Sequence, residues 1–137
     1  DGIPGELIIY GHAPMMVSAQ CVYKNYASCI KERKNGSKSQ PEHLYLNDRY
    51  QKQFEVSRNC THCYNVIYNS QPTSLLHQAR EIRGLVFGSY RIVFRNETEQ
   101  ELQYILQQYT DAFVNGKEIL PPKEGTFTNG HFRRGVD

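Results

Sequence analysis

The chain has 137 residues, enough for one domain with a modest hydrophobic core. Its net charge of +2 is too small to indicate nucleic-acid binding by itself. No apolar run approaches the roughly 20 residues that a membrane-spanning helix needs, so we expect no membrane association.

The first half of the chain predicts short strands. Residues 7–10 are continuously apolar, which is typical of a strand covered on both faces, as in a parallel sheet. We expect residues 11–29 to be irregular and the charged stretch 31–42 to form an exposed loop. Residues 44–46 and 54–56 flank a polar stretch and predict a β-hairpin.

The second half predicts alternating strands and helices. Residues 65–68 form a short strand pattern, and a helix follows over residues 70–84, with a serine as its cap and leucines, alanine and isoleucine on one face. Residues 90–94 predict the next strand. The longest helix is expected over residues 96–116, with Asn96 as its N-cap.

This order of elements predicts α/β architecture. The chain is too short for a complete (β/α)8 barrel, which typically takes about 250 residues, so we predict the C-terminal portion of such a barrel with an inserted β-hairpin. Residues 1–116 would form this segment and carry a four-cysteine site, and residues 117–137 would form an irregular tail. The open edge of the strand at residues 7–10 predicts that the fragment self-associates.

Four cysteines form two pairs along the chain, Cys21 with Cys29 and Cys60 with Cys63. The second pair is a C-x-x-C, which places two thiolates on one tight turn. Four thiolates complete the coordination of zinc or of an iron–sulfur cluster, so we predict a metal site at these residues. The spacing C-x7-C…C-x2-C differs from the two C-x-x-C knuckles of a zinc ribbon, which favours an iron–sulfur cluster.

Two disulfides, or unlinked thiols, are the alternative interpretations of the same four cysteines. Three N-x-S/T sequons, at Asn35, Asn59 and Asn96, favour disulfides. No signal peptide is visible, although the chain begins at Asp1 without a methionine, so a leader could have been removed. We expect a cytoplasmic protein, in which a metal site is favoured over disulfides.

Other polar residues are weaker candidates for a site. His12, His62 and His131 could be ligands or bases, but a solvated histidine or one that shapes a turn is the simpler interpretation. The Asp48-Arg49 dipeptide could bind an anionic substrate or form a local turn. Arg91 lies in a predicted strand and could make an ion pair or contact a substrate.

Three segments resemble a known family. The stretches YGHAPMMVSAQC (residues 10–21), LNDRYQKQFEVSRNCTHCYNVIYNS (residues 46–70) and FTNGHFRRGVD (residues 127–137) resemble motifs of peptidase family U-32, the collagenase-like proteases of unassigned catalytic type. The resemblance runs over nearly the whole chain. It implies a (β/α)8-like barrel whose late strands include residues 7–10, 66–68 and 90–94.

The resemblance also implies a cofactor. Better-understood relatives look like iron–sulfur proteins that help to hydroxylate RNA bases or quinone precursors, and cysteines hold their four-iron four-sulfur cluster. Cys21 matches the cysteine that ends their S-G-Q-C motif, here Ser18-Ala19-Gln20-Cys21. A relative's upstream cysteine corresponds to the region of Met15 and Met16, so Cys60 and Cys63 would supply the missing ligand.

The function implied by the family name is proteolysis, with an RNA or peptide substrate and the upstream barrel portion as partners. The chain contains no H-E-x-x-H and no recognisable nucleophile motif, so we expect the isolated segment to be inactive as a protease. The alternative is a structural metal-binding module with no catalytic role of its own.

Overall fold

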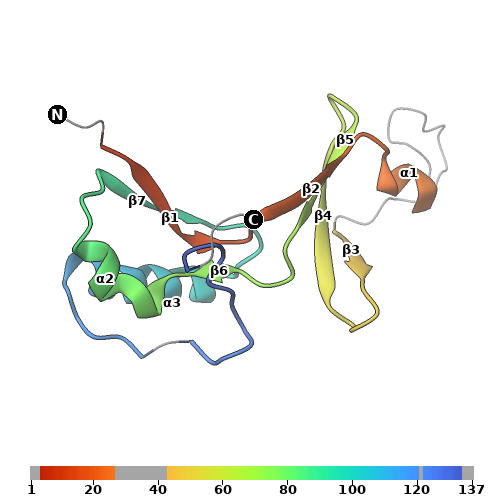
Figure 1. Ribbon diagram of the computed structural model, residues 1–137. Coiled ribbons are helices and arrows are strands. Elements are labelled where there is room, and N and C mark those ends of the chain that lie inside the picture. Colours follow the sequence, from red (N-terminus) through yellow and green to blue (C-terminus); the bar gives the residue numbers. More distant parts are fainter. Residues whose placement is uncertain (1–3, 27–42, 121, 134–137) are drawn as a thin grey trace. The chain divides into compact units, whose positions relative to one another are not determined.

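The computed structural model describes residues 4–26, 43–120 and 122–133 (Figure 1). Its contacts divide the chain into two units. We call Asp1–His12 with Gln71–Asp137 the α/β unit, and Ala13–Ser70 the β unit.

The α/β unit contains a three-stranded sheet of order β6-β1-β7. Strand β1 (Glu6–Gly11) is parallel to β7 (Ser89–Val93) and antiparallel to β6 (Thr73–Ser74). The helices α2 (Ala79–Arg83) and α3 (Glu99–Tyr109) lie on the same face of this sheet (Figure 1). A 3-10 turn η2 (Leu76–Gln78) precedes α2, and a π-helical turn η3 (Thr110–Val114) continues α3.

The core of the α/β unit lies between the sheet and these helices. Ile82 of α2 is fully buried there, together with Ile9, Leu75 and Phe113. The register of β1 against β7 shifts between Ile8 and Tyr10, so two consecutive side chains, Ile9 and Tyr10, are both buried. Ile8 stays 50% exposed, so β1 is covered on one face of the sheet rather than on both.

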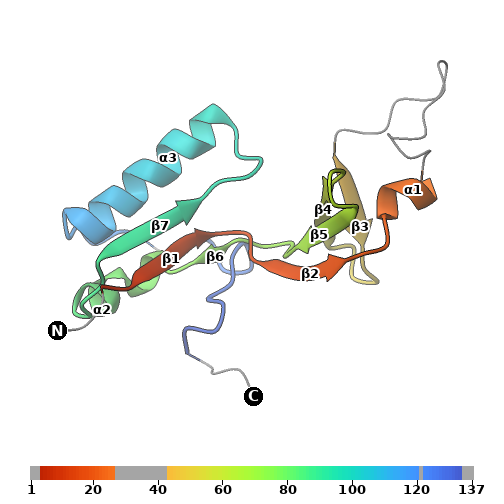
Figure 2. The ribbon, with the colours of Figure 1, turned by 90° about the horizontal axis from the view of Figure 1, so that it is seen from above.

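The β unit contains a four-stranded antiparallel sheet of order β2-β5-β4-β3 (Figure 2). Its strands are β2 (Pro14–Ser18), β3 (Leu44–Asn47), β4 (Gln53–Asn59) and β5 (Tyr64–Tyr68). The short helix α1 (Val22–Tyr26) follows β2. The predicted hairpin at residues 44–46 and 54–56 is confirmed as β3 and β4.

The structure corrects three predictions about single elements. Residues 11–29 are not irregular where they are described, because they contain β2 and α1. The strand at residues 66–68 does not join the sheet of β1, because β5 pairs with β4 and β2 instead, antiparallel to both. The helix after Ser70 begins later than predicted, because residues 73–74 first pair with β1.

The long helix also begins two residues later than predicted, at a cap other than Asn96. Thr98 is the N-cap of α3, and its hydroxyl accepts a hydrogen bond from the Glu101 amide at 3.3 Å. The Glu101 carboxylate in turn accepts one from the Thr98 amide at 2.7 Å, which completes a capping box. Glu97 instead accepts a hydrogen bond from the Tyr10 hydroxyl at 3.0 Å.

We expect Thr98→Ala to reduce the free energy of unfolding of the α/β unit by about 1 kcal/mol, because the Glu101 amide loses the hydroxyl that accepts its hydrogen bond. Urea unfolding followed by circular dichroism measures this change. Gln100→Ala, at an exposed position of the same turn, is the control and should change stability very little. Equal effects of the two substitutions would show that the capping box contributes nothing.

The mixed α/β content of the prediction is confirmed, and the barrel portion stays a prediction. The described part of the tail contains no helix, but its Thr128 pairs with Thr73 next to β6. The proposed boundary at residue 116 stays a prediction, and so does self-association. Among the helices described, none has the length and apolar character needed to cross a membrane.

Candidate metal centre

The C-x-x-C forms the turn between β4 and β5. Asn59, the last residue of β4, is paired with Tyr64, the first residue of β5, so residues 60–63 close a four-residue hairpin loop. The Asn59 side-chain oxygen accepts a hydrogen bond from the His62 amide at 3.0 Å, and its side-chain nitrogen donates one to the Tyr64 hydroxyl at 3.1 Å. The side chain of Asn59 therefore fixes the loop that presents Cys60 and Cys63.

Cys63 has an unusual backbone conformation. Its φ of 56° lies in the left-handed region, which costs a residue with a side chain roughly 1–2 kcal/mol relative to the right-handed region. Its sulfur lies 3.9 Å from the carbonyl oxygen of Cys60. The loop therefore holds an exposed cysteine at a position that glycine would occupy without strain.

Cys21 lies beyond the same end of the sheet as this loop. Ser18 at the end of β2 is paired with Asn65 of β5. Because the two strands are antiparallel, continuing forward from Ser18 and backward from Asn65 leads in one direction. Cys21 and Cys63 therefore both lie past this end of the sheet, three residues after Ser18 and two residues before Asn65.

Two buried side chains fix the backbone next to Cys21. Asn65 is 1% exposed, and its side-chain oxygen accepts a hydrogen bond from the Val22 amide at 2.6 Å. Tyr23 is also buried, and its hydroxyl donates to the Val56 carbonyl of β4 at 2.9 Å. Burial raises the pKa of Tyr23, which keeps this hydroxyl protonated as a donor. The segment that carries Cys21 is thus attached to both β5 and β4.

The structure brings Cys21, Cys60 and Cys63 to one end of the sheet, but not into ligating contact. Within residues 4–26, 43–120 and 122–133, no three His, Cys, Asp or Glu side chains are close enough together to hold a metal ion. Cys21, Cys60 and Cys63 are thiols, with no disulfide among the three. The fourth predicted ligand, Cys29, lies outside the described residues.

Sequence reasoning missed Asn59 and Asn65 as residues that build this site. The signal for them was their position, because the two asparagines flank the cysteine motif in the order Asn59-Cys60-Thr61-His62-Cys63-Tyr64-Asn65. Asn59 was instead interpreted as part of a sequon. Its amide nitrogen, the atom to which a glycan would be attached, donates to Tyr64.

The weaker candidates have local structural roles. His62 stacks against the ring of Tyr64, with centroids 6.5 Å apart, so it shapes the cysteine turn. The Asp48 carboxylate accepts hydrogen bonds from the amides of Tyr50 at 2.7 Å and Lys52 at 2.9 Å, which agrees with the turn interpretation. Arg91 forms an exposed ion pair with Glu6 at 2.7 Å.

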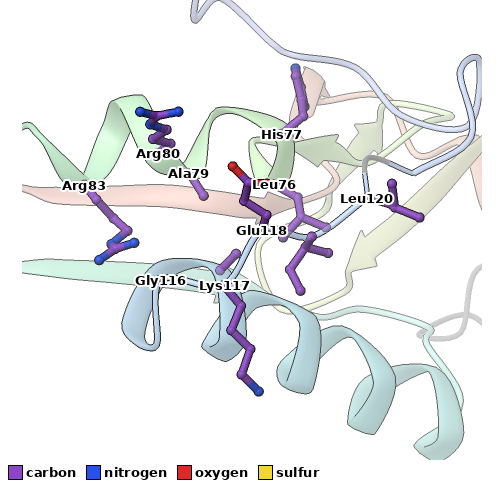
Figure 3. Close-up of a pocket in the computed structure, with 11 residues that line it drawn as sticks. Leu76, His77, Ala79, Arg80, Arg83, Gly116, Lys117, Glu118 and Leu120 are labelled. Carbon is purple, nitrogen blue, oxygen red and sulfur yellow. The ribbon is translucent and has the colours of Figure 1, made fainter.

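A second candidate site is a cavity of about 620 Å³ in the α/β unit, lined by α2 and the segment after η3 (Figure 3). Figure 3 shows that its basic side chains Arg80 and Lys117 point in opposite directions. Lys117 pairs with Asp111 at 2.9 Å, and the guanidinium of Arg83 lies against Gly116, where a Cβ atom would meet it. These charges are therefore directed to different places and do not converge on one ligand.

We expect Cys63→Gly to be more stable than Cys63→Ala by about 1 kcal/mol, because glycine adopts the left-handed conformation of this position without strain and alanine does not. Both variants lose the thiol, so the difference isolates the backbone term. Thermal unfolding of the metal-free chains measures it. Equal stability of the two variants would mean that the loop does not hold residue 63 in this conformation.

Comparison with known proteins identifies no relative: no family model, no curated protein and no solved structure matches the chain.

Proposed function

We propose that the chain carries a four-cysteine metal centre, with Cys21, Cys60 and Cys63 as ligands at one end of the β unit and Cys29 as the fourth. The observation that supports this most is the hydrogen bond from the Val22 amide to buried Asn65. It links the residue after Cys21 to a residue two positions after Cys63. Thiols from two distant segments are thereby held at the same end of one sheet.

Metal binding requires these thiols to move closer together than they are in the described residues. Cys63 is exposed and lies on a hairpin turn, so its side chain can move without disturbing the sheet. Four thiolates can hold either zinc or a four-iron four-sulfur cluster. The spacing C-x7-C…C-x2-C and the resemblance of Cys21 to a cluster ligand in U-32 proteins favour the cluster.

We propose further that the chain is the C-terminal part of a U-32-like protein in the cytoplasm. In that protein the centre would serve hydroxylation of an RNA base or a small molecule, on a substrate held with the upstream barrel portion. An iron–sulfur cluster would supply one-electron chemistry when bound. The cysteine turn is exposed to solvent at Cys63, as a centre that exchanges electrons with a partner requires.

The alternative is a structural metal module. The connection between β2 and α1 and the turn between β4 and β5 are the two segments that such a metal would join. Binding free energy would then appear as folding free energy, so removal of the metal would unfold the β unit. A catalytic centre in this already hydrogen-bonded unit would instead be removed with the sheet intact.

Anaerobic purification, followed by metal analysis and an absorption spectrum, tests the proposal. The wild-type chain should retain iron with sulfide, or zinc, in a fixed ratio to protein. Cys21→Ser, Cys29→Ser, Cys60→Ser and Cys63→Ser should each lower that ratio, whereas Asn47→Ala, at an exposed position at the end of β3, should leave it unchanged. A wild-type chain with no bound metal under these conditions, or equal retention in the serine variants, refutes the four-cysteine centre.

A further inference from the structure

The α/β unit has another cavity, of about 550 Å³, whose lining is mostly apolar and aromatic. Tyr104, Ile105 and Tyr109 of α3 form one side, and Phe127 of the tail also lines it. Small-molecule sites typically occupy roughly 300–1,000 Å³ and combine apolar walls with a few fixed polar groups. The size and lining of this cavity therefore suit a small apolar ligand.

Two large apolar side chains that line this cavity are exposed to solvent. Tyr104 is 66% exposed and Leu120 is 89% exposed. Apolar surface is stabilised when it leaves water, so a ligand that covered both side chains would gain affinity from them. These side chains mark the solvent-facing part of the cavity.

A buried pair of hydroxyls is one part of the polar lining, which also includes Gln108, Glu118, Lys123 and Thr126. The Ser74 and Tyr109 oxygens are 2.7 Å apart, and both residues are more than nine-tenths buried. Two hydroxyls carry two hydrogens, and the bond between them uses one. Neither hydroxyl has another hydrogen-bond partner in the described part of the chain. One buried O–H donor therefore remains without an acceptor, which is costly unless a ligand or a water supplies one.

The tyrosine of this pair stays a donor at neutral pH. Burial raises the pKa of Tyr109 to about 12, and its hydrogen bond with Ser74 opposes the shift only in part. The nearby hydroxyl of Tyr10 is engaged elsewhere, since it donates to Glu97 at 3.0 Å. The surplus hydrogen in the cavity therefore belongs to Ser74 or Tyr109.

Aromatic packing favours a planar ligand. The rings of Tyr10 and Tyr109 lie edge to face in the wall, with centroids 5.6 Å apart. Aromatic pairs prefer such edge-to-face or offset arrangements, and each contributes free energy beyond the area that it buries. A further ring can add to this set next to Tyr104 and Phe127.

We propose that this cavity binds a small planar aromatic molecule that carries one acceptor oxygen, such as an aryl carbonyl group. The ring packs against Tyr104 and Phe127, and the oxygen accepts the surplus hydrogen bond of the Ser74–Tyr109 pair. The site belongs to the α/β unit and does not depend on the cysteine centre of the β unit.

Titration of the isotope-labelled chain with acetophenone and with toluene, followed by amide chemical shifts, tests this proposal. Acetophenone has the acceptor oxygen and toluene lacks it. Both probes should cause saturable shifts of amides around the cavity, and acetophenone should bind about fivefold more tightly, as one added hydrogen bond predicts. Equal affinities would overturn the proposal, because the hydroxyl pair would then be satisfied by water. Shifts that do not saturate would also overturn it, because the probes would then occupy no defined site.

Variants separate the two parts of the site. The double variant Ser74→Ala with Tyr109→Phe keeps the ring and should remove the fivefold preference for acetophenone. Tyr104→Ala changes an exposed side chain, so the chain should fold and bind both probes more weakly. Tyr50→Phe, in the β unit, is the matched control and should change nothing. If the same amides shift when the probe-free chain is diluted, a second copy of the chain occupies the cavity and the proposal is wrong.

Discussion

Replacing Ile82 with alanine should destabilise the α/β unit by about 3 kcal/mol, within the range for removing a buried aliphatic side chain. Ile82 is 0% exposed and belongs to the core cluster with Ile9, Leu75 and Phe113. The cost includes the lost burial and the cavity that remains, because a core between a sheet and helices relaxes only in part.

The matched control is the same substitution at Ile8. That side chain is 50% exposed on β1, so Ile8→Ala should cost less than about 1 kcal/mol. Urea unfolding, with amide signals of the α/β unit as the probe, measures both changes. If the two substitutions cost the same, the core does not lie on the helix-covered face of β1, and the arrangement of this unit is wrong.

Replacing Asn65 with alanine should affect both stability and metal binding. Asn65 is buried and its side-chain oxygen accepts the Val22 amide at 2.6 Å, so alanine leaves that amide without its acceptor. We expect a loss of about 2 kcal/mol in the β unit, within the range for an orphaned buried donor. We also expect metal affinity to fall about tenfold, because residues that position ligands typically have effects of that size.

Asn47→Ala is the control for Asn65. Asn47 is exposed at the end of β3 in the same sheet, and its substitution should change neither quantity. Metal competition against a chelator and thermal unfolding of the metal-free chain separate the two effects. Unchanged metal affinity in Asn65→Ala would mean that the bond from Val22 does not position Cys21.

The elements that could be predicted from the sequence have strong local patterns. The apolar run of β1, the β3–β4 hairpin and β7 were each predicted from a few adjacent residues and are confirmed. Strand β2 was missed because Met15, Met16 and Val17 are all exposed, so the segment shows no alternation between a buried and an exposed face. The pairing of β5 with β2 was not predicted, because pairing between strands that are distant along the chain leaves no local signal.

The candidate site was predictable to a similar extent. The C-x-x-C identifies a turn with two thiols from its spacing alone, and the structure forms that turn at residues 60–63. The role of Asn65 depends on β2 lying next to β5, which a single sequence does not reveal. An asparagine next to a turn is ordinarily interpreted as a turn residue. Its burial and its bond to Val22 appear only once the strands are paired.

The most direct test of the metal centre is thiol alkylation of the anaerobically purified chain, read by mass spectrometry before and after metal removal. The proposed centre predicts that Cys21, Cys29, Cys60 and Cys63 are all protected while metal is bound and all react once a chelator has removed it. Modification of Cys21 in a chain that keeps its metal would contradict the shared centre. So would a metal-free chain lighter by the four hydrogens that two disulfides remove.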